Sequence, residues 1–217
     1  MISEISKVIF LMPPKTASNS IKKSLIESGI TPIKKETIYP DIHLFLSEIV
    51  ETYGVKNVND YKIVQIVRDP QTRFASSYYH QQRILKNIET NLKGLSFEEY
   101  TIHLKDCMLS KKDFFERFYG RIDFIQDFIA KGKSWGGTRL YLNQYQWNDL
   151  GANVKHFKLE EISKDIKPLS DYLEIDLKPL KSINTNKTPT DYSTLYSEET
   201  LGIVNQLFKK DFELFGY

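Results

Sequence analysis

The sequence contains very little cysteine: among its 217 residues, Cys107 is the single one. A lone cysteine excludes an intrachain disulfide framework and a thiolate metal site, and it favours a reducing compartment. Long hydrophobic runs are also missing. The apolar run at residues 8–12 is shorter than the core of a signal peptide and far shorter than a membrane span. We therefore expect a soluble, cytoplasmic protein without a membrane span.

An excess of either charge is missing as well. Thirty basic residues face 28 acidic ones, which leaves a net charge of +2. This balance gives no argument for a nucleic-acid or membrane-surface partner, so any recognition of anions must be local. Hydrophobic residues make up 41% of the chain, and no repeat or interdomain linker interrupts it. Length and composition predict one domain that spans residues 1–217.

Residues 8–26 read as a strand, a loop and a helix. The apolar run at 8–12 is typical of a strand buried on both faces of a parallel sheet, and two prolines end it. Small and hydroxylic residues follow Lys15, after which apolar residues recur at helical spacing over residues 21–26. We predict that Ser18 or Asn19 is the N-cap of this helix.

Such a loop is suited to hold an anion. A helix N-terminus offers N–H groups and about half a unit of positive charge, to which Lys15 and several hydroxyls add here. An ordinary capped helix after a buried strand is the alternative interpretation of this stretch taken alone.

A second anion motif follows the apolar run at residues 61–67. This run ends at Arg68, and Pro70 is suited to the first turn of a following helix that carries Ser76. Ligands of open parallel sheets bind at the carboxyl ends of the strands, so both motifs should meet at one sheet edge. The alternative for Arg68 and Asp69 is a surface pair beside a helix cap.

The two motifs resemble those of the carbohydrate sulfotransferases. Residues 14–20, Pro-Lys-Thr-Ala-Ser-Asn-Ser, resemble the loop that binds the 5′-phosphosulfate of 3′-phosphoadenosine 5′-phosphosulfate (PAPS). Residues 66–78 are similar to the motif in which an arginine and a serine eight residues later bind the 3′-phosphate. The resemblance implies these cofactor-binding residues: Lys15, Thr16, Ala17, Ser18, Asn19, Ser20, Arg68 and Ser76. Residues 143–147 resemble a glutamine-tryptophan element of the family, to which we assign no role from sequence.

The resemblance implies a single α/β domain with a central, mostly parallel sheet flanked by helices, in the P-loop NTPase-like sulfotransferase fold. It implies PAPS as co-substrate, 3′-phosphoadenosine 5′-phosphate (PAP) as product, no metal, and a hydroxylated acceptor such as a carbohydrate. Lys15 would meet the charge that develops on the leaving oxygen. His43 would be the base, because it lies at a junction before a short helix and aligns with a histidine of related enzymes. Glu36, Glu48 or a purely structural His43 are the alternatives.

Further elements are expected along the chain. Ser96 and Glu99 form a capping box for a helix that runs to about residue 109, and residues 154–158 alternate as a strand. Residues 160–173 read as a helix disturbed by Pro168, and a last amphipathic helix starts near Ser197. We also expect a strand with a loop at 30–38, a helix at 114–129, and a loop at 183–190 that passes near the nucleotide in relatives.

Two competing functions differ in class. Kinases and other nucleotide triphosphatases share the strand, loop and helix, but their Gly-Lys-Ser/Thr loop is absent here and no acidic strand end offers a Mg²⁺ ligand. A non-catalytic module that binds a nucleotide or an anionic glycan is the other alternative. Turnover of labelled PAPS separates such a module from an enzyme.

Overall fold

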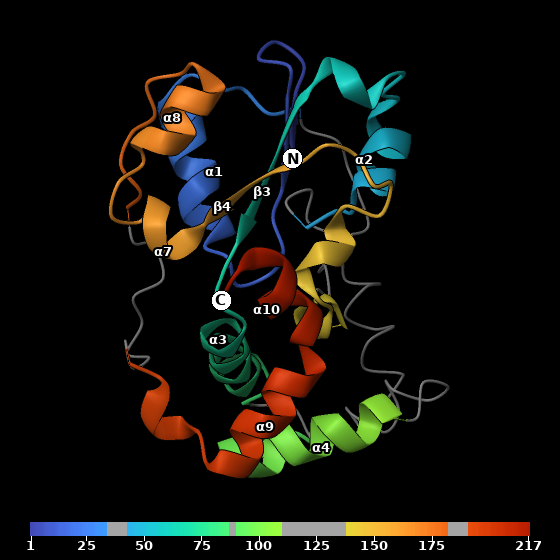
Figure 1. Cartoon of the computed structure of the whole chain (residues 1–217), viewed down its shortest axis with the longest axis vertical. Helices are drawn as coiled ribbons and strands as arrows, with labels where there is room; N and C mark the ends of the chain where they lie inside the picture. Colours follow the sequence, from blue (N-terminus) through green and yellow to red (C-terminus); the bar gives the residue numbers. More distant parts are fainter. Residues whose placement is uncertain (34–42, 87–89, 110–137, 182–190) are drawn as a thin grey trace. The chain divides into compact units, whose positions relative to one another are not determined.

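A computed structural model describes residues 1–33, 43–86, 90–109, 138–181 and 191–217 of the chain (Figure 1). These residues divide into two compact units, one of Met1–Asp69 with Leu142–Asn186 and one of Pro70–Tyr141 with Lys187–Tyr217. The first unit carries the sheet. No helix within the described ranges is long and apolar enough to cross a membrane.

The sheet of the first unit has the strand order β1-β2-β3-β4. Its strands are β1 (Ile2–Ser3), β2 (Val8–Leu11), β3 (Lys62–Val67) and β4 (Lys155–Lys158). Strand β2 pairs in parallel with β3, and β3 pairs in parallel with β4, whereas β1 is antiparallel to β2. The predicted α/β class with a mostly parallel sheet is therefore confirmed, as are the strands at 8–12, 61–67 and 154–158.

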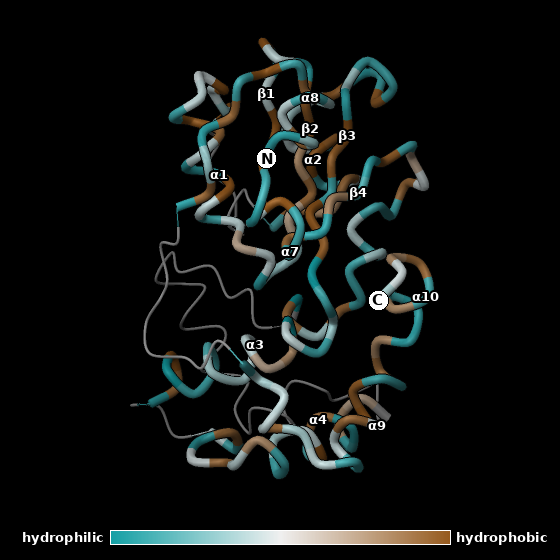
Figure 2. The backbone as a smooth tube through the Cα atoms, turned by 60° about the vertical axis from the view of Figure 1, so that its left-hand side comes forward, coloured by the Kyte–Doolittle hydropathy of each residue, from teal (hydrophilic) through white to brown (hydrophobic). Residues whose placement is uncertain are grey.

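Helices cover both faces of this sheet, which explains its apolar strands. Alternate residues of β2 and β3 pack on one face against α1 (Ser18–Glu27), α7 (Leu159–Ile162) and α8 (Lys167–Leu173). The opposite face packs against α2 (Leu46–Tyr53) and the 3₁₀ helix η3 (Gln144–Trp147), and a further 3₁₀ helix, η1 (Val58–Asp60), precedes β3. Figure 1 shows α1, α7 and α8 on one side of the strands and α2 on the other. The residues of β2 and β3 are predominantly hydrophobic, as the brown colour of these strands in Figure 2 shows.

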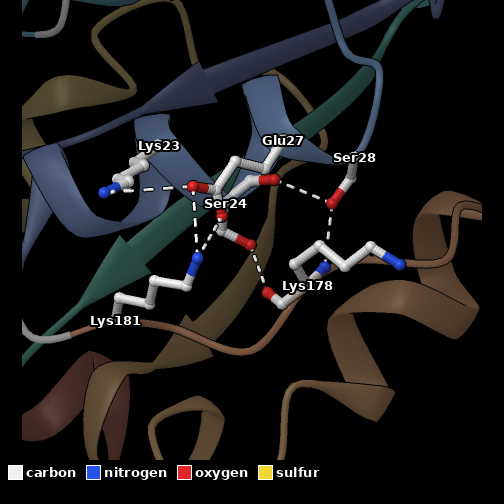
Figure 3. A network of polar contacts seen from close by, with 6 residues as sticks. All are labelled: Lys23, Ser24, Glu27, Ser28, Lys178 and Lys181. Atoms are coloured by element: carbon white, nitrogen blue, oxygen red, sulfur yellow. Dashed lines mark hydrogen bonds and ion pairs between the residues drawn. The ribbon is translucent and has the colours of Figure 1, made fainter.

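Helix α1 is also tied to the segment that follows α8 (Figure 3). Ser24 donates a hydrogen bond to the carbonyl of Lys178, and the Lys178 amide donates to Ser28 Oγ at 2.8 Å. Lys181 Nζ lies 3.1 Å from a carboxylate oxygen of Glu27. The ion pair is largely exposed and contributes little. The serine contacts fix the C-terminal part of α1 to the chain after α8.

The second unit is helical. It comprises α3 (Pro70–Ile84), α4 (Phe97–Leu109), α9 (Glu198–Leu207) and α10 (Lys209–Phe215), with the 3₁₀ helices η2 (Thr138–Tyr141) and η4 (Ser193–Leu195). Its core is rich in aromatic residues, including Phe74, Phe97 and Tyr100. The predicted capping box is confirmed, since Ser96 N–H donates to Glu99 Oε2 at 2.8 Å and Glu99 N–H donates to Ser96 Oγ at 3.2 Å.

Two expectations need correction, and three lie partly or wholly beyond the described residues. Residues 160–173 form two helices, not one, because Pro168 lies in the first turn of α8, where a missing N–H costs nothing. Residues 30–33 form no strand, and 34–38 lie outside the described residues. The expected helix at 114–129 and the loop at 183–190 also lie outside them.

Candidate active site

The loop between β2 and α1 has an unusual backbone. Lys15 and Ala17 both adopt positive φ, at 71° and 57°, in the left-handed region that residues other than glycine rarely occupy. Such conformations cost about 1–3 kcal/mol each and gather at ligand-binding sites. The predicted N-cap was wrong: Ala17 is the cap, Ser18 is the first helical residue, and no cap side chain hydrogen-bonds to the first turn. The left-handed entry through Ala17 thus starts the helix without a capping side chain.

The hydroxyl groups of this loop have different environments. Thr16 is fully buried, and its Oγ1 donates to the carbonyl of Pro13 at 2.7 Å, which holds the loop closed. Ser18 is 6% exposed, and its Oγ has no hydrogen-bond partner among the described residues. An unsatisfied buried hydroxyl costs about 1–3 kcal/mol, so a ligand acceptor at this position would be stabilising. Asn19 is exposed and Ser20 is half-buried at the first turn of α1.

Arg68 joins the second motif to this loop. It follows β3 directly, and its Nη1 donates to the carbonyl oxygen of Lys15 at 3.1 Å. The parallel pairing of Leu11 with Gln65 brings the carboxyl ends of β2 and β3 to the same edge of the sheet. The structure therefore places two of the predicted site residues, Lys15 and Arg68, in direct contact.

Side chains from distant segments hold the backbone around Arg68. Gln144 accepts from the Arg68 amide at 2.9 Å and donates to the Arg68 carbonyl at 2.8 Å, while Glu160 accepts from the Asp69 amide at 3.0 Å. Sequence reasoning missed both contacts. The available signal was Gln65, a polar residue inside an apolar strand, which donates to the Gln144 carbonyl at 2.5 Å.

His43 lies beside the strand that leads into the loop. Its Nδ1 is 2.8 Å from the carbonyl oxygen of Met12, the residue that follows β2. A carbonyl can only accept, so Nδ1 carries the proton of this bond. In the neutral ring, Nε2 is then the nitrogen with the lone pair, which is the form that a general base requires.

Of the two alternative bases, one is already engaged in a hydrogen bond at a helix start and the other lies outside the described residues. Glu48 lies at the start of α2, where its Oε2 accepts from the amide of Phe45 at 2.7 Å. Its carboxylate therefore serves the helix N-terminus. Glu36 lies outside the described residues.

The other three histidines belong to regular elements. His80 is in α3 and His103 is in α4 of the second unit, and His156 is on β4. Partial desolvation and the positive charge of Lys155 lower the pKa of His156.

Ser76 is half-buried in α3, within the second compact unit, whereas Arg68 belongs to the first. Its contact with the same phosphate as Arg68 stays a prediction. Arg73, from the same motif, is fully buried, and its Nη2 donates to the Leu140 carbonyl of η2 at 3.2 Å. Arg73 thus supports the helical unit. Within the described ranges, no three His, Cys, Asp or Glu residues gather in a group that could hold a metal ion.

Comparisons with known proteins bear on this site. The sequence profile of the family described as "Sulfotransferase domain" matches residues 43–179, more than half of the chain and a range that includes His43 and Arg68. A solved structure, that of a sulfotransferase from Alicyclobacillus acidocaldarius, is 16% identical, covers 95% of this chain and 92% of its own, and has a TM-score of 0.48. No curated protein sequence is significantly similar to this chain.

Proposed function

Because the chain belongs to the sulfotransferase domain family, we propose that it transfers a sulfuryl group from PAPS to a hydroxyl group of an acceptor, with carbohydrates as the acceptor class. The observation that carries this proposal is the hydrogen bond from Arg68 to the Lys15 carbonyl. It joins the two anion motifs at one sheet edge, as a donor with phosphate groups at its 3′ and 5′ positions requires.

The loop residues have the chemistry to bind the 5′-phosphosulfate. Lys15 supplies a positive charge, the first turn of α1 supplies amides at the positive end of the helix, and Ser18 supplies a buried hydroxyl. PAPS, when bound, supplies the sulfuryl group and a phosphate leaving group. As the leaving oxygen gains charge, Lys15 stabilises it, and the loss of one such donor typically raises the barrier by about 2.7–4 kcal/mol.

His43 is suited to remove the proton of the acceptor hydroxyl. The acceptor oxygen forms the new bond to sulfur, the bond between sulfur and the 5′-phosphate oxygen breaks, and the hydroxyl proton moves to Nε2 of His43. The carbonyl of Met12 accepts the hydrogen bond from Nδ1 and so favours the protonated ring that results. This one hydrogen bond fixes the orientation of the His43 ring and so the position of both of its nitrogens. The Glu48 carboxylate, in contrast, already accepts from the Phe45 amide, so we prefer His43 as the base.

Transfer from labelled PAPS to a panel of glycans and phenols tests the proposed function. The expected result is labelled product on at least one glycan, with a large loss of rate and of PAP affinity in Lys15→Ala. Binding of PAP without transfer to any acceptor would favour the non-catalytic module. Transfer of phosphate from ATP would favour the kinase-like phosphotransferase.

A further inference from the structure

Gln144, the first residue of η3, is fully buried, and both polar atoms of its side chain contact one peptide segment. Its Oε1 accepts from the Arg68 amide at 2.9 Å, and its Nε2 donates to the Arg68 carbonyl at 2.8 Å. A side-chain amide thus pairs with Arg68 as a neighbouring strand would. The paired hydrogen bonds hold the backbone of Arg68 just past the end of β3.

Gln144 is itself held by the same strand. Gln65 of β3 is fully buried, and its Nε2 donates to the Gln144 carbonyl at 2.5 Å. The Oε1 atom of Gln65 has no hydrogen-bond partner among the described residues. A buried amide that is only partly satisfied destabilises a fold relative to an apolar residue. The pair of glutamines therefore reduces stability but fixes the position of η3 against β3.

This arrangement fixes the position of the backbone from which the Arg68 side chain extends. With its backbone held at both N–H and C=O, the guanidinium reaches the Lys15 carbonyl at 3.1 Å. We propose that Gln144 is a positioning residue, which orients Arg68 toward the loop at residues 15–20 and so prepares the nucleotide site without contacting the nucleotide. This inference rests on the proposed function, because it assigns Arg68 to a phosphate of PAPS.

A matched control is available in the same 3₁₀ helix. Gln146 Oε1 accepts from the amide of Asn143 at 2.9 Å, a hydrogen bond within the start of η3 itself. Gln144→Met and Gln146→Met each replace a glutamine by an apolar side chain of similar length. Only the first removes the contacts to Arg68, so general damage to η3 should affect both variants.

The experiment measures PAP affinity by calorimetry and steady-state kinetics with PAPS. We expect Gln144→Met to weaken PAP binding about 10-fold, which corresponds to about 1.4 kcal/mol, and to raise KM for PAPS more than it lowers kcat. Gln146→Met should bind PAP as the wild type does. In an Arg68→Ala background, Gln144→Met should have little further effect, because the group that it positions is already removed.

Gln144→Glu provides a second variant in case Gln144→Met does not fold. It keeps an acceptor for the Arg68 amide but places an oxygen against the Arg68 carbonyl, so it should also weaken PAP binding. Wild-type PAP affinity in the folded Gln144 variants would overturn the inference and leave the proposed function intact. Equal weakening with and without Arg68 would also overturn it. A wild-type protein that does not bind PAP would overturn the proposed function and the inference with it.

Discussion

The carbonyl oxygen of Met12 determines which nitrogen of His43 carries the proton in the neutral ring. Because it accepts from Nδ1 at 2.8 Å, the neutral ring has its lone pair on Nε2. A substitution at position 43 can therefore keep the structural contact and remove the proposed base. Asparagine suits this purpose, since its side-chain amide can donate from a position close to that of Nδ1.

We predict that His43→Asn folds, binds PAP as the wild type does, and turns over roughly 10²- to 10⁴-fold more slowly, the range typical of general-base loss. Protonation of Nε2 removes the lone pair, so the wild-type rate should fall in acid. This acid limb should be absent from the pH–rate profile of His43→Asn.

Two variants complete the comparison. Glu48→Gln keeps an acceptor for the Phe45 amide and removes the carboxylate, so it should retain most of its turnover. His156→Asn changes a histidine on β4 and should also be close to wild type. If His43→Asn retains the wild-type rate and profile while Glu48→Gln loses activity, the base is Glu48 and His43 is structural.

At the scale of elements, η3 and the residues after it link two parts of the site. Gln144 holds Arg68, while Trp147 packs against Phe45 with ring centroids 5.1 Å apart. Asp149 Oδ1 accepts from the amide of Ser47 at 2.9 Å in the first turn of α2. The segment that carries His43 is therefore supported by the same short stretch that supports Arg68.

We predict that Asp149→Ala lowers the free energy of unfolding by about 0.5–2 kcal/mol, the usual cost of a lost helix cap, and reduces kcat more than PAP affinity. The reason is that α2 begins at Leu46, three residues after His43, whereas the loop at 15–20 does not depend on this contact. Asp149→Asn keeps an acceptor for the Ser47 amide and should lose less stability. Denaturant unfolding and PAP calorimetry on both variants provide the measurement. A fall in PAP affinity as large as the fall in kcat would contradict this assignment.

Patterns local in sequence predicted most elements but not their contacts. The apolar runs at 8–12 and 61–67, and the Ser96–Glu99 capping box, each combine periodicity with an end signal, so their strands and helix were predicted correctly. The N-cap prediction of Ser18 or Asn19 failed because Ala17, in the left-handed conformation, is the N-cap. The helix therefore already begins at Ser18. The contact between Gln144 and Arg68 joins segments far apart in the chain, which no local pattern encodes. The position of the site residues at one edge of the sheet could be predicted only because the strands that precede them were expected to be parallel.

At the scale of the whole molecule, nucleotide binding should raise the melting temperature in proportion to the phosphates recognised. We predict that PAP raises the melting temperature well above the shift given by AMP, because AMP lacks the 3′-phosphate that the proposed function assigns to Arg68. Arg68→Ala should remove most of this difference, since a charge-assisted hydrogen bond contributes about 1.5–3 kcal/mol. Thermal unfolding at matched ligand concentrations measures both. Equal shifts from PAP and AMP in the wild type would exclude the 3′-phosphate assignment.

The unsatisfied hydroxyl of Ser18 has a consequence for directed evolution of this protein. Ser18→Ala removes a buried polar atom that has no hydrogen-bond partner among the described residues, so the ligand-free variant should melt at a higher temperature than the wild type. The same variant should gain less from PAP, because the hydroxyl proposed to donate to the 5′-phosphate is gone. Selection for heat resistance without nucleotide would thus enrich for variants at position 18 that are expected to bind PAP more weakly. Selection with PAP present would retain the serine.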